Sequence, residues 1–153
     1  MTRMPEAWDY LILTASNERQ ASAYESQLEL RRRSGHLSRV KTTLVVADLD
    51  GRRIGSGGST LQCLLEVLNR EARNLEPGAL LNGGAERILR GLRILIVHAG
   101  GDSRRLPAYG PCGKIFVPVP GESESAHGET LFDRLTPAFL DMPPGRPGEG
   151  QLL

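Results

Sequence analysis

Apolar and polar positions divide the chain into short apolar runs separated by amphipathic stretches. Three runs rich in Leu, Ile and Val predict buried strands, at 9–16 ("DYLILTAS"), 42–50 ("TTLVVADLD") and 92–101 ("LRILIVHAGG"). A further extended piece, "KIFVPVP" at 114–120, contains two prolines, which predict a sheet edge or a loop. Strands that alternate with helices predict an open, mostly parallel α/β sheet, whose ligands bind beyond the carboxyl ends of the strands.

The helical stretches begin and end at residues typical of helix termini. Asn17 is placed as an N-cap, with Gln20 positioned to cap back. The basic run at 31–33 is either the solvated end of this first helix or a phosphate patch, and a solvated end suits the helix dipole. A second helix, capped by Ser59 or Thr60 and stopped near 76–78, has a predicted apolar face of Leu61, Leu64, Leu65, Leu68 and Ala72.

Two shorter helices are expected in the second half of the chain. One covers 85–90, and the other lies within 129–142, where we expect Pro137 to interrupt or kink it. The chain ends in "EGQLL", which resembles the first residues of a further strand.

Two glycine-rich segments follow predicted strands. In "GRRIGSGGST" (51–60), Gly55, Gly57 and Gly58 permit close approach to the backbone, and the N–H groups of the next helix suit an anion. The spacing departs from the dinucleotide fingerprint, and no acidic residue stands convincingly ~20 positions on, so we exclude a dinucleotide site. The segment is either a tight strand-to-helix turn or part of an anion site.

The second segment, "HAGGDSRRLPAYGPCGK" (98–114), combines glycine with positive charge. Gly100 and Gly101 end a strand where a side chain would block a ligand. The segment is not a P-loop, because the required glycine and hydroxyl are missing from their positions. Cationic side chains around a glycine turn can bind the oxygens of a triphosphate. The candidates for this contact are Arg104, Arg105 and Lys114.

Composition limits the other classes of function. The 153 residues carry 19 basic and 18 acidic side chains, a net charge of +1, so nothing global indicates nucleic acid or a membrane surface as partner. No apolar stretch approaches the ~20 residues that span a bilayer, and the N-terminus lacks an apolar signal core, which predicts a cytoplasmic protein. Cys63 and Cys112 are too few for a disulfide framework or a four-ligand zinc site and are expected as reduced thiols.

Three motifs in order resemble one enzyme family. "AGGDSRRL…GK", with "RLP" and "GKIF", resembles the signature of sugar-1-phosphate nucleotidyltransferases in the form found in L-fucose-1-phosphate guanylyltransferases (GDP-fucose pyrophosphorylases) and in bifunctional L-fucokinase/guanylyltransferases. "DYLILTAS" and "GRRIGSGGSTL" resemble the preceding segments of that family, so the resemblance covers most of 9–140. It implies a Rossmann-like nucleotidyltransferase sheet, incomplete at the C-terminus, with 1–153 as the N-terminal portion and 143–150 as a Pro/Gly-rich loop.

The resemblance also implies a reaction and site residues. GTP and L-fucose 1-phosphate would give GDP-L-fucose and pyrophosphate, with Mg²⁺ bridging the phosphates. Arg105 and Lys114 would be the catalytic cations, and their short spacing favours the fucose type. The implied nucleotide-binding residues are Gly57, Gly58, Ser59, Gly100, Gly101, Ser103 and Arg104.

The resemblance leaves several points open. The family's metal-binding carboxylate would follow the last residues here, and we assign neither Asp102, expected in a surface turn, nor Asp133, expected at a helix start. His98 is either a base or, as we favour, a strand-end histidine with satisfied hydrogen bonds. We expect a fragment that binds nucleotide weakly or not at all and lacks turnover. The alternatives are a region preceding an L-fucokinase domain, although no kinase motif is present, and an inactive fragment.

Overall fold

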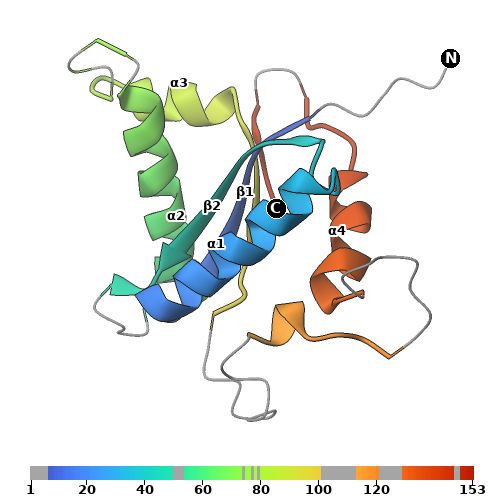
Figure 1. Ribbon diagram of the computed structural model, residues 1–153. Helices are drawn as coiled ribbons and strands as arrows, with labels where there is room; N and C mark the ends of the chain where they lie inside the picture. Colours follow the sequence, from blue (N-terminus) through green and yellow to red (C-terminus); the bar gives the residue numbers. More distant parts are fainter. Residues whose placement is uncertain are drawn as a thin grey trace, which may run out of the picture.

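The computed structural model describes residues 7–49, 54–73, 75–76, 78, 80–100, 113–120, 129–146 and 149–153. Within these residues, helices cover both faces of a four-stranded sheet (Figure 1). The strands are β1 (Trp8–Ala15), β2 (Val40–Ala47), β3 (Arg93–Val97) and β4 (Gln151–Leu152), in the spatial order β2-β1-β3-β4. All three neighbouring pairs are parallel, which confirms the predicted α/β class and the strand expected at "EGQLL".

The helices are distributed between the two faces of the sheet. In chain order they are α1 (Glu18–Arg33), α2 (Gly55–Ala72), α3 (Gly84–Arg90), the short 3₁₀ helix η3 (Lys114–Phe116) and α4 (Leu131–Leu140). Helices α1 and α4 pack with η3 on one face, while α2 packs on the other. Among the described residues, none of the helices combines the length and the apolar character that a bilayer crossing requires.

The core is built around β1, which is covered on both faces. Leu11 and Leu13 pack with α1 and α4, whereas Tyr10 and Ile12 pack with Cys63 of α2 and the other residues of that layer. Successive side chains of a strand point to opposite faces, so a strand buried on both sides needs an almost continuous apolar run. The run "DYLILTA" meets this requirement, and β1 occupies a central position with β2 and β3 as its neighbours.

Helix α1 begins as predicted. The side chain of Asn17 accepts a hydrogen bond of 2.9 Å from the backbone N–H of Gln20. In a capping box the side chain of Gln20 would accept a hydrogen bond from the backbone N–H of Asn17. Here its Oε1 accepts instead from the backbone N–H of the preceding residue, Ser16, at 2.9 Å. These bonds fix the chain where it leaves β1 and enters α1.

Helix α2 starts earlier than predicted and buries a different face. It begins at Gly55, so neither Ser59 nor Thr60 is its N-cap and the predicted loop is already helical at Gly57 and Gly58. The side chains of Leu61 and Leu65 are 64% and 60% exposed, so these two members of the predicted face are wrong. Leu68 is buried and Leu64 packs against the core, as predicted. The buried face also includes an i, i+4 row of smaller residues that the prediction left out: Ser59, Cys63 and Val67.

The structure differs from two predictions that concern segments with proline. Helix α4 continues through Pro137 to Leu140, so the expected interruption is wrong. The flanking residues Phe132 and Leu140 are buried in the core, which holds the helix on both sides of the proline. The segment 114–120 is not extended throughout: it starts with η3 and then forms an isolated antiparallel bridge between Pro118 and Thr130.

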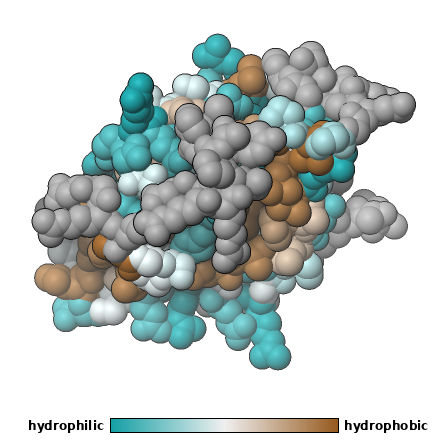
Figure 2. Space-filling view, turned by 90° about the horizontal axis from the view of Figure 1, so that it is seen from below, coloured by the Kyte–Doolittle hydropathy of each residue, from teal (hydrophilic) through white to brown (hydrophobic). Residues whose placement is uncertain are grey.

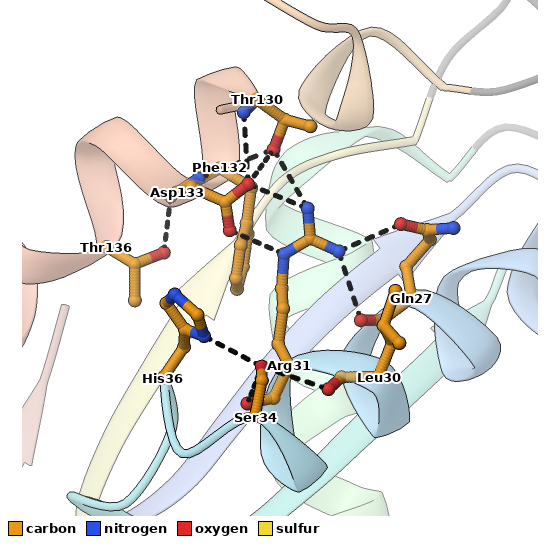
Figure 3. Close-up of polar contacts among 9 residues, drawn as sticks. All are labelled: Gln27, Leu30, Arg31, Ser34, His36, Thr130, Phe132, Asp133 and Thr136. Carbon is orange, nitrogen blue, oxygen red and sulfur yellow. Dashed lines mark hydrogen bonds and ion pairs between the residues drawn. The ribbon is translucent and has the colours of Figure 1, made fainter. Parts of the chain in front are cut away.

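Arg31 of α1 is buried. It therefore belongs neither to a solvated helix end nor to a phosphate patch, the two interpretations of the basic run at 31–33. Its guanidinium donates to both carboxylate oxygens of Asp133, at 2.6 and 2.8 Å, and to the carbonyl and Oε1 of Gln27 (Figure 3). Asp133 is a helix-start residue, as expected, because it forms a capping box with Thr130. The pair thus joins the end of α1 to the beginning of α4, while Arg32 and Arg33 stay exposed.

The Arg31–Asp133 pair links folding to pH. Burial alone would raise the pKa of the Asp133 carboxyl, but hydrogen bonds from Arg31 and Thr130 outweigh burial and lower this pKa below its usual value. A carboxyl with a lowered pKa in the folded state stabilises the fold above its unfolded-state pKa of about 3.9. This stabilisation is lost as the pH falls through the folded-state pKa.

We expect Asp133→Asn to lower the free energy of unfolding by about 3 kcal/mol near neutral pH, because it leaves the charge of Arg31 buried without its partner. The difference from the unaltered chain narrows below about pH 4, where the carboxyl of the unfolded chain takes up a proton, and it is lost as the pH falls through the folded-state pKa. Urea unfolding followed by circular dichroism at several pH values measures both effects.

The matched control is Glu29→Gln, which breaks the exposed pair with Arg33. This change costs at most about 0.5 kcal/mol. Equal losses in the two variants, or a difference that stays constant at low pH, would contradict the role given to Asp133.

Candidate functional site

The carboxyl edge of the sheet brings the two glycine-rich segments together. Oγ of Ser59, in the first turns of α2, donates a hydrogen bond of 3.1 Å to Oδ1 of Asp48, which follows β2. The neighbouring Thr60 Oγ1 shares a hydrogen bond of 3.2 Å with Nε2 of His98, which follows β3. The start of α2 is therefore tied to the ends of β2 and β3, and described residues of both segments, Thr60 and His98, meet at this edge.

This edge is also the place where the strand order reverses. From β1 the chain moves to β2 on one side, and from β3 it moves to β4 on the other. In open α/β sheets, the crevice at such a switch point, beyond the carboxyl ends of the strands, is the usual ligand site. The crevice here would lie between the ends of β1 and β3.

Gly100 lies at the switch point, close to the end of β1. Its N–H approaches Oγ1 of Thr14 at 3.4 Å, and a Cβ at this position would lie 3.2 to 3.3 Å from the backbone of Ala15 and Ser16. The approach of the two backbones therefore gives a packing reason for glycine here. The ligand contact that the sequence predicts for Gly100 stays a prediction.

The side chain of Tyr24 of α1 contacts Ala99 and Gly113, which lie near the two ends of the segment 101–112. Its hydroxyl donates a hydrogen bond of 3.1 Å to the carbonyl of Ala99. Gly113, with a φ of +69°, packs so closely on the same side chain that a Cβ would lie 2.0 Å from the hydroxyl oxygen. One buried side chain thus contacts both Ala99, which follows β3, and Gly113, which precedes η3.

The sequence analysis missed this role of Tyr24. Helical spacing indicates only a buried position, but a buried tyrosine hydroxyl requires a hydrogen-bond partner, and that requirement was the available signal. Burial raises the pKa of Tyr24 to about 12, so its hydroxyl keeps its proton and donates at neutral pH.

Some of the predicted site residues lie in the described part of the structure, and the others lie outside it. Gly57 faces open space, a Cβ at Gly58 would lie 2.9 Å from Cβ of Ile54, and Ser59 is buried on Asp48. Lys114 is exposed at the start of η3 and has no hydrogen-bond or ion-pair partner in the described part of the chain. The others lie outside the described residues: Gly101, Asp102, Ser103, Arg104, Arg105 and Cys112.

The ionisable groups at this edge do not form a metal centre. Burial first, and the charge of Asp48 second, raise the pKa of the Cys63 thiol to about 11, so this cysteine is a protonated core residue as expected. His98 is exposed and shares its hydrogen bond with Thr60, which fits a strand-end histidine better than a base. In the residues that the structure describes, no three His, Cys, Asp or Glu side chains are placed to hold a metal ion.

We expect Gly113→Ala to destabilise the chain more than Gly35→Ala. Both glycines have a positive φ, +69° and +82°, but only Gly113 would also drive a Cβ into Tyr24, since Gly35 faces open space. The conformational cost alone is about 1 kcal/mol, and the contact with Tyr24 should add at least about 2 kcal/mol. Urea unfolding measures the difference, and similar losses for the two variants would refute the contact.

Comparisons with known proteins identify relatives. A family model described as the fucose pyrophosphorylase domain matches residues 86–150. The chain is 38% identical over 125 residues to a bifunctional fucokinase/GDP-fucose pyrophosphorylase of Arabidopsis thaliana, covering 78% of this chain and 12% of the relative. It is 34% identical over 147 residues to a fucose-1-phosphate guanylyltransferase of Mus musculus, covering 94% of this chain and 22% of the relative. It is 36% identical over 115 residues to a fucose-1-phosphate guanylyltransferase of Homo sapiens, covering 75% of this chain and 17% of the relative.

The chain spans less than a quarter of the length of these relatives. No solved structure gives a significant match. The domain match contains β3, Gly100 and Lys114, which belong to the third motif of the resemblance, whereas the first two motifs, at 9–16 and 51–61, precede it. The predicted resemblance is therefore confirmed, and this chain is related to the fucose pyrophosphorylase family.

Proposed function

We propose that this chain forms the nucleotide-binding part of an L-fucose-1-phosphate guanylyltransferase. The supporting observation is the convergence at the carboxyl edge, where Ser59 and Thr60 of α2 contact Asp48 and His98. Both glycine-rich segments that resemble the family thereby reach one end of the sheet, at the switch between β1 and β3. The names of the relatives supply the reaction class.

The reaction would transfer a guanylyl group from GTP. A phosphate oxygen of L-fucose 1-phosphate attacks the α-phosphorus, the bond from that phosphorus to the bridging oxygen breaks, and pyrophosphate leaves. The protein contributes mainly by positioning the two phosphates and balancing developing negative charge. In this proposal Arg105 stabilises the leaving pyrophosphate, and Lys114 contacts the α-phosphate or the sugar phosphate.

Magnesium is also part of the proposal. An ion of this kind usually binds through substrate phosphates and one or two carboxylates. The described residues offer no group of three ligands, and Asp133 is already engaged by Arg31, so we assign no protein ligand and derive no step from the ion. We also propose a cytoplasmic location, where nucleoside triphosphates are available.

The fucokinase alternative has less support. The Arabidopsis thaliana relative carries both activities in its name, but the domain that matches this chain is described as fucose pyrophosphorylase. Kinase activity is therefore not assigned to these residues. The inactive-fragment alternative is tested by nucleotide binding.

We expect weak, millimolar binding of GTP with Mg²⁺, detected by amide shifts in ¹⁵N-resolved NMR spectra. The shifts should cluster at Ser59, His98 and Gly100, at the carboxyl edge, and spare Leu37 and Val40 at the opposite end of the sheet. Shifts confined to that opposite end, or their absence, would refute the proposal. Pyrophosphate release on adding L-fucose 1-phosphate would contradict the expected lack of turnover.

We expect Lys114→Met to weaken GTP binding about tenfold, because a charge-assisted contact to a phosphate is lost. Lys41→Met is the matched control, since Lys41 is exposed and pairs with Asp9 away from the carboxyl edge. The same NMR titration measures both affinities. Equal weakening in the two variants would indicate a general effect of charge and argue against a contact by Lys114.

A further inference from the structure

Asp48 stands at the carboxyl edge with a fixed carboxylate. Its backbone N–H donates to the carbonyl of Ala15 at 2.8 Å, which continues the β1–β2 pairing by one residue. Its Oδ1 accepts from the hydroxyl of Ser59, a residue that is only 8% exposed. Backbone and side chain are thus both held, and the carboxylate has a defined position.

Among the described residues, no cation pairs with Asp48, whereas each other described aspartate has one. Asp9 pairs with Lys41, Asp133 with Arg31 and Asp141 with Arg39. Among the described residues, Ser59 is the sole side-chain donor to Asp48. A carboxylate offers about four acceptor positions, so most of its capacity remains for a donor from a ligand.

The position of Asp48 argues against a phosphate or a phosphate-bound metal as its partner. A carboxylate repels phosphate, and β1 lies between Asp48 on β2 and Gly100 after β3. Two strand spacings amount to about 10 Å, which exceeds the reach of an ion bound directly to the phosphates. A nucleoside spans such a separation, with its base at one end and its phosphates at the other.

Exposed apolar side chains flank the same position. Leu49, which follows Asp48, is 63% exposed, and Ile54, the N-cap residue of α2, is 39% exposed. The view from below shows apolar surface exposed among polar side chains at this end of the molecule (Figure 2). A purine ring, with apolar faces and a polar edge, fits this combination of apolar side chains and one convergent acceptor.

We infer that Asp48 recognises the base of the bound nucleotide and favours guanine, an inference that rests on the proposed function. Guanine presents two neighbouring donors, N1–H and the 2-amino group, whereas adenine presents an acceptor at N1 beside its 6-amino donor. A carboxylate has acceptors alone, so it can accept two bonds from guanine but at most one from adenine. Ser59 orients the carboxylate for this contact.

The test compares the binding of GTP, inosine triphosphate and ATP, each with Mg²⁺, by NMR titration of the whole chain. The unaltered chain should favour GTP over ATP by about tenfold or more, with inosine triphosphate, which lacks the 2-amino group, in between. Asp48→Asn replaces one acceptor oxygen with a donor and should bring the GTP-to-ATP preference close to one. Glu25→Gln makes the same charge change at an exposed position of α1 and should preserve the preference.

The outcomes separate this inference from the proposed function. If Asp48→Asn keeps the native preference, or if inosine triphosphate binds the unaltered chain as tightly as GTP, the assignment of Asp48 is overturned while the nucleotide site stands. The inosine triphosphate comparison uses the unaltered chain and so applies even if the variant fails to fold. If none of the three nucleotides binds the unaltered chain, the proposed function fails, and the assignment of Asp48 fails with it.

Discussion

The contacts of Tyr24 with Ala99 and Gly113 are the constraint on which the candidate site depends. One buried side chain binds the carbonyl of Ala99 through its hydroxyl and leaves no room for a side chain at Gly113. The positions of Ala99, which follows β3, and Gly113, which precedes η3, are therefore both set by α1. A shift of α1 would move both positions together.

Aromatic and ionic contacts extend from Tyr24 to α4. The ring of Phe116 packs edge-on against Tyr24, with ring centres 5.3 Å apart, and against Phe132 at 5.2 Å. The Arg31 guanidinium lies over both phenylalanine rings, at 4.7 and 5.5 Å, while it pairs with Asp133. Because a buried ion pair adds little net stability, its main effect here is to specify how α1 meets α4.

These contacts explain why the segment before the domain match is part of the same structural unit. The family model matches residues 86–150, but the core of that region is completed by β1 and α1. On the other face, α2 supplies Ser59 and Thr60 to the ends of β2 and β3. The proposed site is therefore assembled from both halves of the chain, with the phosphates assigned to the later half and the base to the earlier one.

The sequence by itself determined the features that depend on near neighbours: the three long strands, the parallel α/β class, the cap at Asn17 and the place of Asp133 in the first turn of a helix. Tertiary structure decided the features that depend on distant residues. Arg31 and Asp133 are 102 positions apart, so local spacing could not reveal that the arginine is buried. Likewise, the leucines of α2 gave a clear apolar period, but the sheet covers only one side of the helix. That side contains Leu68 together with the row of smaller residues, and it leaves Leu61 and Leu65 exposed.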